Sequence, residues 1–255
     1  MRDILRSEWI KLMSIRSTPS TLAVAAFICL AGGLAATASD VASWPAMTTV
    51  QRTAVDPVQD SILGAAVAQI AFGVFGVLAV TSEYASGTIR TSVAAVPERR
   101  RLMAGKATVT GGVALVFATL LVAGSFFLGQ AVLSQRSLQA GLSTPGALRS
   151  VLYAGCYSAV VALIGYGLGL LLHHTAAAIT ALVAVIFLIP QISQTLPGTW
   201  ADRIGEYLPY NAARSATSTH RVPHTLTPTW SLLVCAAYAL VPTLAGIWLI
   251  ERRDT

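Results

Sequence analysis

The chain has 255 residues, of which 55% are hydrophobic and only 11% are charged, with 17 Lys and Arg against 11 Asp and Glu. A soluble domain has about 25% charged residues, so this composition excludes ordinary water-soluble enzymes, disordered chains and disulfide scaffolds. The net charge of +6 does not indicate nucleic-acid binding, because the basic residues form short clusters between long uncharged tracts. We therefore expect a polytopic membrane protein.

Residues 1–16 precede the first apolar tract and have the pattern of an amphipathic helix that lies in the membrane interface. One side gathers Met1, Leu5, Trp9, Leu12 and Met13. The opposite side gathers Arg2, Asp3, Arg6 and Ser14, while Glu8 and Arg16 interrupt the pattern. A charged flank without a defined helix is the alternative interpretation.

The same region also has features of a secretory signal. An apolar run from Thr21 to Leu34 is followed by Ala36-Thr37-Ala38, which resembles a signal-peptidase site. Cleavage there would remove the first span. The long leading segment with Asp3 and Glu8 argues against cleavage.

Six tracts are long and apolar enough to cross a bilayer, which requires about 20 residues. The predicted spans are about 19–38, 61–82, 107–133, 150–172, 175–196 and 230–250. None of them contains Asp, Glu, Lys or Arg. Backbone polar groups must be satisfied within lipid, and strand-length alternation is absent, so we predict an all-α fold of six helices in a single domain over 1–255. Only His173 and His174 separate the fourth tract from the fifth, which predicts a tight turn.

The distribution of basic residues predicts the orientation in the membrane. With both termini in the cytoplasm, the inner segments hold Arg2, Arg6, Lys11, Arg16, Arg90, Arg99, Arg100, Arg101, Lys106, Arg252 and Arg253. The outer segments hold Arg52, Arg136, Arg149, Arg203, Arg214 and Arg221. The excess on one side favours cytoplasmic N- and C-termini.

Several kinds of chemistry are disfavoured. Proton-coupled carriers and intramembrane metalloproteases need ionisable groups within their spans, and the predicted spans have none. A Ser–His pair at depth is not expected, because Ser125 lies within a span while His173 and His174 lie at a boundary. Gly105-Lys106 lacks the remaining residues of a phosphate-binding loop, so we predict no nucleotide, cofactor or metal site on this chain.

Spans two and five carry most of the amides found at membrane depth. Gln69 lies in span two, whereas Gln191, Ser193 and Gln194 follow Pro190 in span five. Pro190 predicts a kink or break, because proline has no N–H to donate. The amides would either line a polar pathway or form hydrogen bonds between helices.

Glycines are spaced for close contact between helices in spans two and four. They are Gly73 and Gly76 in span two and Gly165 and Gly169 in span four. Small residues at such spacing let helix backbones approach each other.

Two loops stand out from the rest of the chain. In residues 83–106, Pro97 suits a first helical position, so a helix that carries Arg99, Arg100 and Arg101 is expected to begin there and continue into span three. In the outer segment 197–229, a short interfacial helix is predicted from apolar residues between Pro197 and Pro209. These apolar residues are Trp200, Ile204, Tyr207 and Leu208.

The order of these motifs resembles the membrane subunits of bacterial type-2 ABC exporters. The motifs are Ser7-Glu8-Trp9-Ile10-Lys11-Leu12 with Ser17-Thr18, Glu83-Tyr84, Gly87-Thr88-Ile89-Arg90, and Pro97-Glu98-Arg99-Arg100-Arg101 ending at Lys106. The six-span plan, the short turn between spans four and five, and the outer segment before span six match that family too.

This resemblance implies a permease subunit of an ATP-driven exporter in the bacterial plasma membrane. It would pair with a second permease, identical or related, and with two ATPase subunits that bind ATP and Mg²⁺. The expected substrate is hydrophobic or amphipathic, such as a drug, an antibiotic or a peptide. Membrane lipid would be a further partner, and nucleic acid would not.

The resemblance also implies roles for individual residues. The family's coupling helix lies between spans two and three, which assigns ATPase coupling to Glu83, Gly87, Arg90, Pro97, Glu98, Arg99, Arg100 and Arg101. Glu83 would pair with an arginine of this loop or of the partner. The family's transport path is lined by spans two and five, which makes path candidates of Gln69, Phe72, Phe75 and Gln191. A membrane anchor without a transport path is the alternative function, and an intramembrane enzyme is a third.

Overall fold

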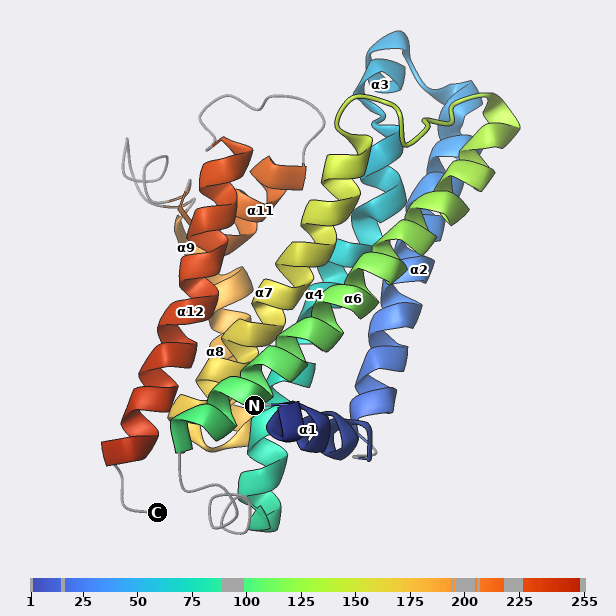
Figure 1. Ribbon diagram of the computed structural model, residues 1–255. Coiled ribbons are helices and arrows are strands. Elements are labelled where there is room, and N and C mark those ends of the chain that lie inside the picture. Colours follow the sequence, from blue (N-terminus) through green and yellow to red (C-terminus); the bar gives the residue numbers. More distant parts are fainter. Residues whose placement is uncertain are drawn as a thin grey trace.

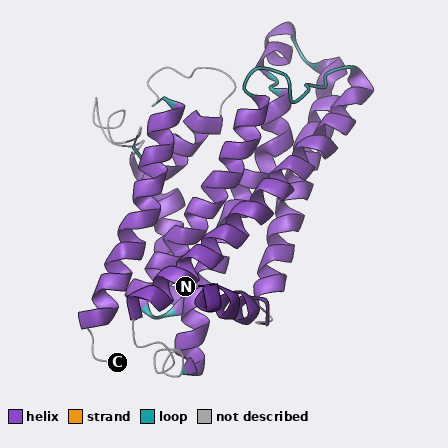
Figure 2. Ribbon diagram, in the orientation of Figure 1, coloured by secondary structure: helices purple, strands orange, loops and turns teal. Residues whose placement is uncertain are grey.

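The computed structural model describes residues 2–14, 17–88, 99–193, 195, 205, 207–217 and 227–252. Within these residues the chain forms helices joined by turns and contains no strand (Figure 2). The long helices run side by side as a bundle (Figure 1). One end of the bundle, here the α1 end, carries α1 (Arg2–Ser14), and the other, the α3 end, carries α3 (Thr49–Ala54).

Six helical segments are long and apolar enough to cross a membrane, which confirms the predicted all-α fold with six transmembrane helices. They are α2 (Ser17–Ser43), α4 (Pro57–Ser86), α6 (Arg99–Leu133), α7 (Ala147–Leu172), the continuous segment of α8 (Thr175–Val183), η3 (Ala184–Leu188) and α9 (Ile189–Ser193), and α12 (Pro228–Arg252). The chain is a multi-pass membrane protein.

Local sequence fixes both ends of α4. At the α3 end, the Asp56 side chain accepts hydrogen bonds from the N–H groups of Val58 (3.0 Å) and Gln59 (3.2 Å), and Pro57 occupies the first turn. At the α1 end, Gly87 terminates the helix with φ +72°, a left-handed conformation that a side chain would disfavour.

The tight turn predicted at the histidine pair is also present. Helix α7 ends at Leu172 and α8 begins at Thr175. His173 closes α7 in a left-handed conformation (φ 55°), and its N–H donates to the carbonyl oxygen of Gly169 (3.0 Å). Two residues therefore suffice to reverse the chain between neighbouring spans.

Pro190 is preceded by a π-helical turn, η3. There the N–H of Ile189 donates to the carbonyl oxygen of Ala184, five residues back. Proline cannot donate, so the α-helical pattern is interrupted at this point, and a widened turn is a common way for a helix to absorb such a defect. The irregularity predicted at Pro190 is therefore confirmed, although the segment continues to Ser193.

Helices α4 and α7 pack closely through the glycines that the sequence singled out. A methyl group at Gly76 would lie 1.8 Å from the carbonyl oxygen of Ala162, and one at Gly165 would lie 2.1 Å from that of Gly73. No real side chain fits at these distances. The prediction of close backbone contact at these glycines is confirmed.

Polar side chains join three helices toward the α3 end. The Ser125 hydroxyl on α6 contacts the carbonyl oxygens of Cys29 on α2 (3.2 Å) and Ser61 on α4 (2.7 Å). One turn further along α6, the Gln130 amide nitrogen donates to the carbonyl oxygen of Pro57 (2.8 Å). Ser125 thus connects helices within the bundle, which accounts for a buried serine without any catalytic role.

The periphery of the bundle is apolar. Large side chains such as Phe27 on α2, Leu120 on α6 and Val241 on α12 are mostly exposed, as expected for helices that face lipid. The predicted interfacial helix around Trp200 and Ile204 lies outside the described residues. The described helix of that region, α11 (Pro209–Thr217), begins at the proline where the prediction ended.

Candidate functional site

Helix α1 lies across the bundle at the α1 end, next to the first turns of α6 (Figure 1). Glu8 and Leu12 are its buried residues, whereas Trp9, Ile10 and Met13 are exposed. Of the predicted apolar face, Leu12 therefore packs against the bundle, whereas Trp9 and Met13 remain exposed beside it. One side of α1 contacts the bundle through Glu8 and Leu12, and the exposed apolar residues can face lipid.

Close contact between α1 and α6 depends on Gly105. A methyl group at that position would lie 2.7 Å from Cγ2 of Ile4. The absence of a side chain at Gly105 lets α1 approach the α6 backbone next to Lys106. The approach brings the charged groups of the two helices within reach of each other.

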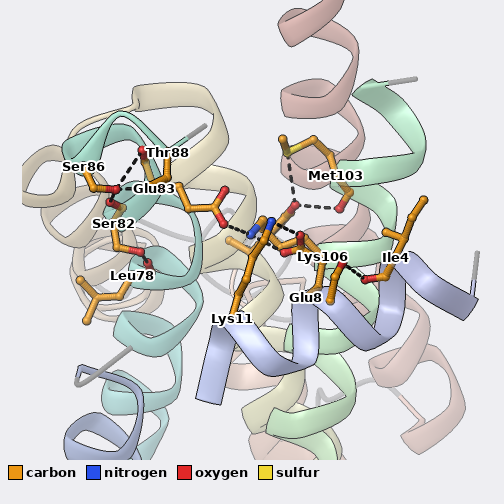
Figure 3. A network of polar contacts seen from close by, with 12 residues as sticks. Ile4, Glu8, Lys11, Leu78, Ser82, Glu83, Ser86, Thr88, Met103 and Lys106 are labelled. Carbon is orange, nitrogen blue, oxygen red and sulfur yellow. Dashed lines mark hydrogen bonds and ion pairs between the residues drawn. The ribbon is translucent and has the colours of Figure 1, made fainter. Parts of the chain in front are cut away.

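Four charged side chains from α1, α4 and α6 meet where α1 packs against the bundle, as Figure 3 shows. The Lys106 ammonium lies 2.5 Å from Oε2 of Glu8 and 2.6 Å from Oε1 of Glu83. The Lys11 ammonium lies 2.8 Å from the other oxygen of Glu8. We call Glu8, Lys11, Glu83 and Lys106 the charge cluster.

The charge cluster is balanced in charge and almost fully buried. The side chains of Glu8, Glu83 and Lys106 are only 2%, 6% and 6% exposed, whereas Lys11 is 39% exposed and reaches the surface. Removing a charge from water costs several kcal/mol, and only close pairing offsets this cost. One oxygen of Glu83, Oε2, has no hydrogen-bond partner within the protein, so Glu83 depends on Lys106.

The charge cluster corrects one expectation. An arginine was expected to pair with Glu83, but the partner in the structure is Lys106. Glu83 lies in the last turn of α4 and Lys106 lies two turns into α6. Their contact therefore holds together the two ends of the segment that connects α4 to α6. Glu8 contacts the same lysine and so attaches α1 to this point.

Neighbouring contacts connect the charge cluster to α7. The Tyr166 hydroxyl donates to the carbonyl oxygen of Met103 on α6 (2.7 Å). At the end of α4, the ring of Tyr84 meets the ring of His173 edge to face, with centroids 4.5 Å apart. At the α1 end of the bundle, α4, α6 and α7 are therefore connected to one another and to α1.

The structure places only some of the predicted coupling residues. Glu83 is buried in the charge cluster, Gly87 ends α4, and Arg100 and Arg101 are exposed in the first turn of α6, next to the half-buried Arg99. Arg90, Pro97 and Glu98 lie outside the described residues. The three arginines belong to the same continuous helix as the span.

The predicted path residues are not gathered at one place within this chain. Phe72 and Phe75 are buried in the core, where Phe72 packs against Phe117 with ring centroids 6.4 Å apart. Gln191 is exposed on α9, while Gln69 is buried in α4. Gln69 lines a cavity between α4, α7 and α11.

The pairing of Glu8 with Lys106 was missed by sequence reasoning, although a signal was present. Glu8 interrupts the apolar pattern of residues 1–16, and Lys106 immediately precedes an uncharged tract. A charge at such a position needs an opposite charge nearby. Two charges of this kind at the same predicted membrane boundary are candidates for one pair.

Neither a protein-family model nor a curated protein matches this sequence. The chemistry of the site is therefore judged from its own residues. In the described part of the chain, the charge cluster contains no nucleophile paired with a base and no group of metal ligands. Its arrangement suits a mechanical connection between helices.

Proposed function

We propose that this protein is the membrane-spanning subunit of an ATP-driven exporter, which moves a hydrophobic or amphipathic substrate out of the cell. A second permease subunit and two separate ATPase subunits, which bind ATP and Mg²⁺, would complete the transporter. The observation that carries the proposal is the charge cluster, because the Glu83–Lys106 contact holds together both ends of the loop that resembles a coupling loop.

A transporter driven by a separate ATPase needs a rigid route from the docking surface to the spans. Movement of the loop between α4 and α6 would be transmitted to both helices at once, since Glu83 and Lys106 join them. Glu8 would carry α1 along. Helix α4 in turn contacts α7 through Gly73, Gly76 and Gly165, so the displacement would reach the centre of the bundle.

Charge reversal on the loop tests the docking surface. We expect Arg99→Glu combined with Arg101→Glu to reduce co-purification of the ATPase subunit at least 10-fold, because opposed charges at an interface become like charges. The matched control is Arg136→Glu, an exposed arginine at the α3 end. Undiminished capture by the double variant, together with full transport activity, would contradict docking at this loop.

The alternative function is a membrane anchor or accessory protein without a transport path. The two functions differ in what the chain does to ATP hydrolysis. A permease subunit should form a stable complex with its ATPase and change the hydrolysis rate when lipophilic compounds are added. An anchor should leave that rate unchanged in reconstituted membranes.

Orientation in the plasma membrane, with both termini in the cytoplasm, is part of the proposal. Ala85→Cys at the α1 end and Gln135→Cys at the α3 end are both at exposed positions. In a background with the three native cysteines replaced by alanine, a membrane-impermeant maleimide added to intact cells should label Cys at 135 and spare Cys at 85. The reverse pattern would contradict the orientation.

A further inference from the structure

A cavity of about 160 Å³ lies between α4, α7 and α11, in the half of the bundle nearer the α3 end. Apolar residues such as Ile62, Leu63 and Ala154 form part of its wall. An apolar cavity of about 150 Å³ accommodates a benzene ring. The space therefore suits a ring-sized group with a short polar end.

Two buried polar atoms in this wall have no hydrogen-bond partner within the protein. They are Oε1 of Gln69 and the hydroxyl of Tyr157, in residues that are 1% and 8% exposed. The Gln69 amide nitrogen already donates to the carbonyl oxygen of Ala66 (2.5 Å), so its unused oxygen is an acceptor. Leaving a buried polar atom unpaired costs about 1–3 kcal/mol, which a bound donor would recover.

Acidic residues at the cavity favour a ligand with a positive charge. The carboxylate of Asp60 lines the cavity, and Asp40 and Asp56 lie close enough to add to its negative field. One oxygen of Asp60 accepts from the N–H of Asp56 (3.1 Å). Tyr157 and Tyr210 also line the space, and an aromatic ring attracts a cation that binds beside its face.

We propose that this cavity binds the ammonium group of a small amphipathic amine. The three N–H groups of the ammonium would donate to Gln69 Oε1, to the Tyr157 hydroxyl and to Asp60, while the apolar body of the molecule would pack against Ile62 and Leu63. Arg214, an exposed residue that also lines the cavity, lies where an anionic group on the same molecule would be accepted. The ligand class is thus defined by its positive charge, a property that the proposed export function does not specify.

Binding to this cavity does not require an ATPase, so it is tested on the purified full-length chain in lipid nanodiscs. The probe is 2-phenylethylammonium, compared with 2-phenylethanol and 3-phenylpropanoate in calorimetric titrations. The amine should bind at least 10-fold more tightly than the alcohol and the carboxylate. Equal binding of the amine and the alcohol would overturn the proposal, and ATPase capture measured separately would show whether the export function fails with it.

Variants locate the site. Gln69→Leu and Tyr157→Phe should each weaken amine binding about 10-fold, the usual effect of one lost hydrogen bond to a charged group. The controls are Gln135→Leu, at an exposed amide of η2 at the α3 end, and Tyr153→Phe, one turn from Tyr157 and not in the cavity wall. Both controls should bind the amine like the unmodified protein.

Melting temperature separates a ligand site from a structural role. Tyr157→Phe removes only an unpaired buried hydroxyl, so its melting temperature should equal or exceed that of the unmodified protein in the absence of amine. Gln69→Leu also removes the hydrogen bond to Ala66, so it is required only to remain folded. Unchanged amine affinity in both variants would overturn the proposal and would mean that only water satisfies these atoms. A selective loss of amine affinity in a fully folded variant would support it.

Discussion

Replacing Lys106 with methionine should lower the free energy of unfolding by about 3–5 kcal/mol, the largest effect expected of any single substitution in the charge cluster. Methionine preserves most of the volume of lysine but leaves the carboxylates of Glu8 and Glu83 buried at the same place without their shared cation. The measurement is the midpoint of unfolding in detergent micelles with increasing denaturant, followed by circular dichroism.

Two further variants test whether the loss of charge pairing causes this effect. Lys11→Met removes the cation that reaches the surface, so solvent screening should limit its effect to less than about 1 kcal/mol. The triple variant Glu8→Gln, Glu83→Gln and Lys106→Met contains no buried charge and should recover much of the lost stability. Equal losses for Lys106→Met and Lys11→Met would contradict the charge cluster as described.

Adding one methyl group at Gly76 should be the second most damaging change. The new Cβ would lie 1.8 Å from the carbonyl oxygen of Ala162, so α4 and α7 would have to move apart along their shared face. Overpacking a core typically costs about 1–3 kcal/mol. We expect Gly76→Ala to reach the upper part of that range and Gly76→Val to yield no monodisperse protein on size-exclusion chromatography.

Gly112 offers a matched control for this effect. It lies within α6, and a methyl group there would meet no atom within 4 Å. Gly112→Ala should therefore be neutral or stabilising by about 0.5–1 kcal/mol, since alanine favours a helix more than glycine does. If Gly76→Ala proved as harmless as Gly112→Ala, the close contact between α4 and α7 would be wrong.

The bundle itself was predictable from the sequence because its signals are local. Each span is a continuous uncharged tract, His173 and His174 mark the only interruption between two of them, and Gly87 marks a helix end through its own backbone preference. The same holds for Pro190, whose missing N–H disturbs the turn before it. None of these features depends on which helices become neighbours.

The candidate site was less predictable because it depends on contacts between distant segments. Periodicity placed Glu8 as an interruption of an apolar face, but it cannot reveal that α1 meets α6 at Gly105. The cavity is harder still to foresee. Gln69 and Tyr157 are ordinary residues of apolar helices, and nothing in their local sequence indicates that their polar atoms would be buried without a partner beside a cavity.

The π turn before Pro190 has a consequence for the whole fifth span. Four of its buried residues, Ala178, Leu182, Ile186 and Pro190, repeat every four positions, and Ser193 follows three positions later. On a regular α-helix such a repeat drifts by about 40° at each step, so Pro190 would lie about 120° around the helix from Ala178. A wider turn at Ala184–Leu188 cancels much of this drift and keeps one straight buried stripe. Apolar residues at a four-residue spacing that leads into a proline can therefore share one buried face when a widened turn precedes the proline, an arrangement that a conventional helical wheel would hide.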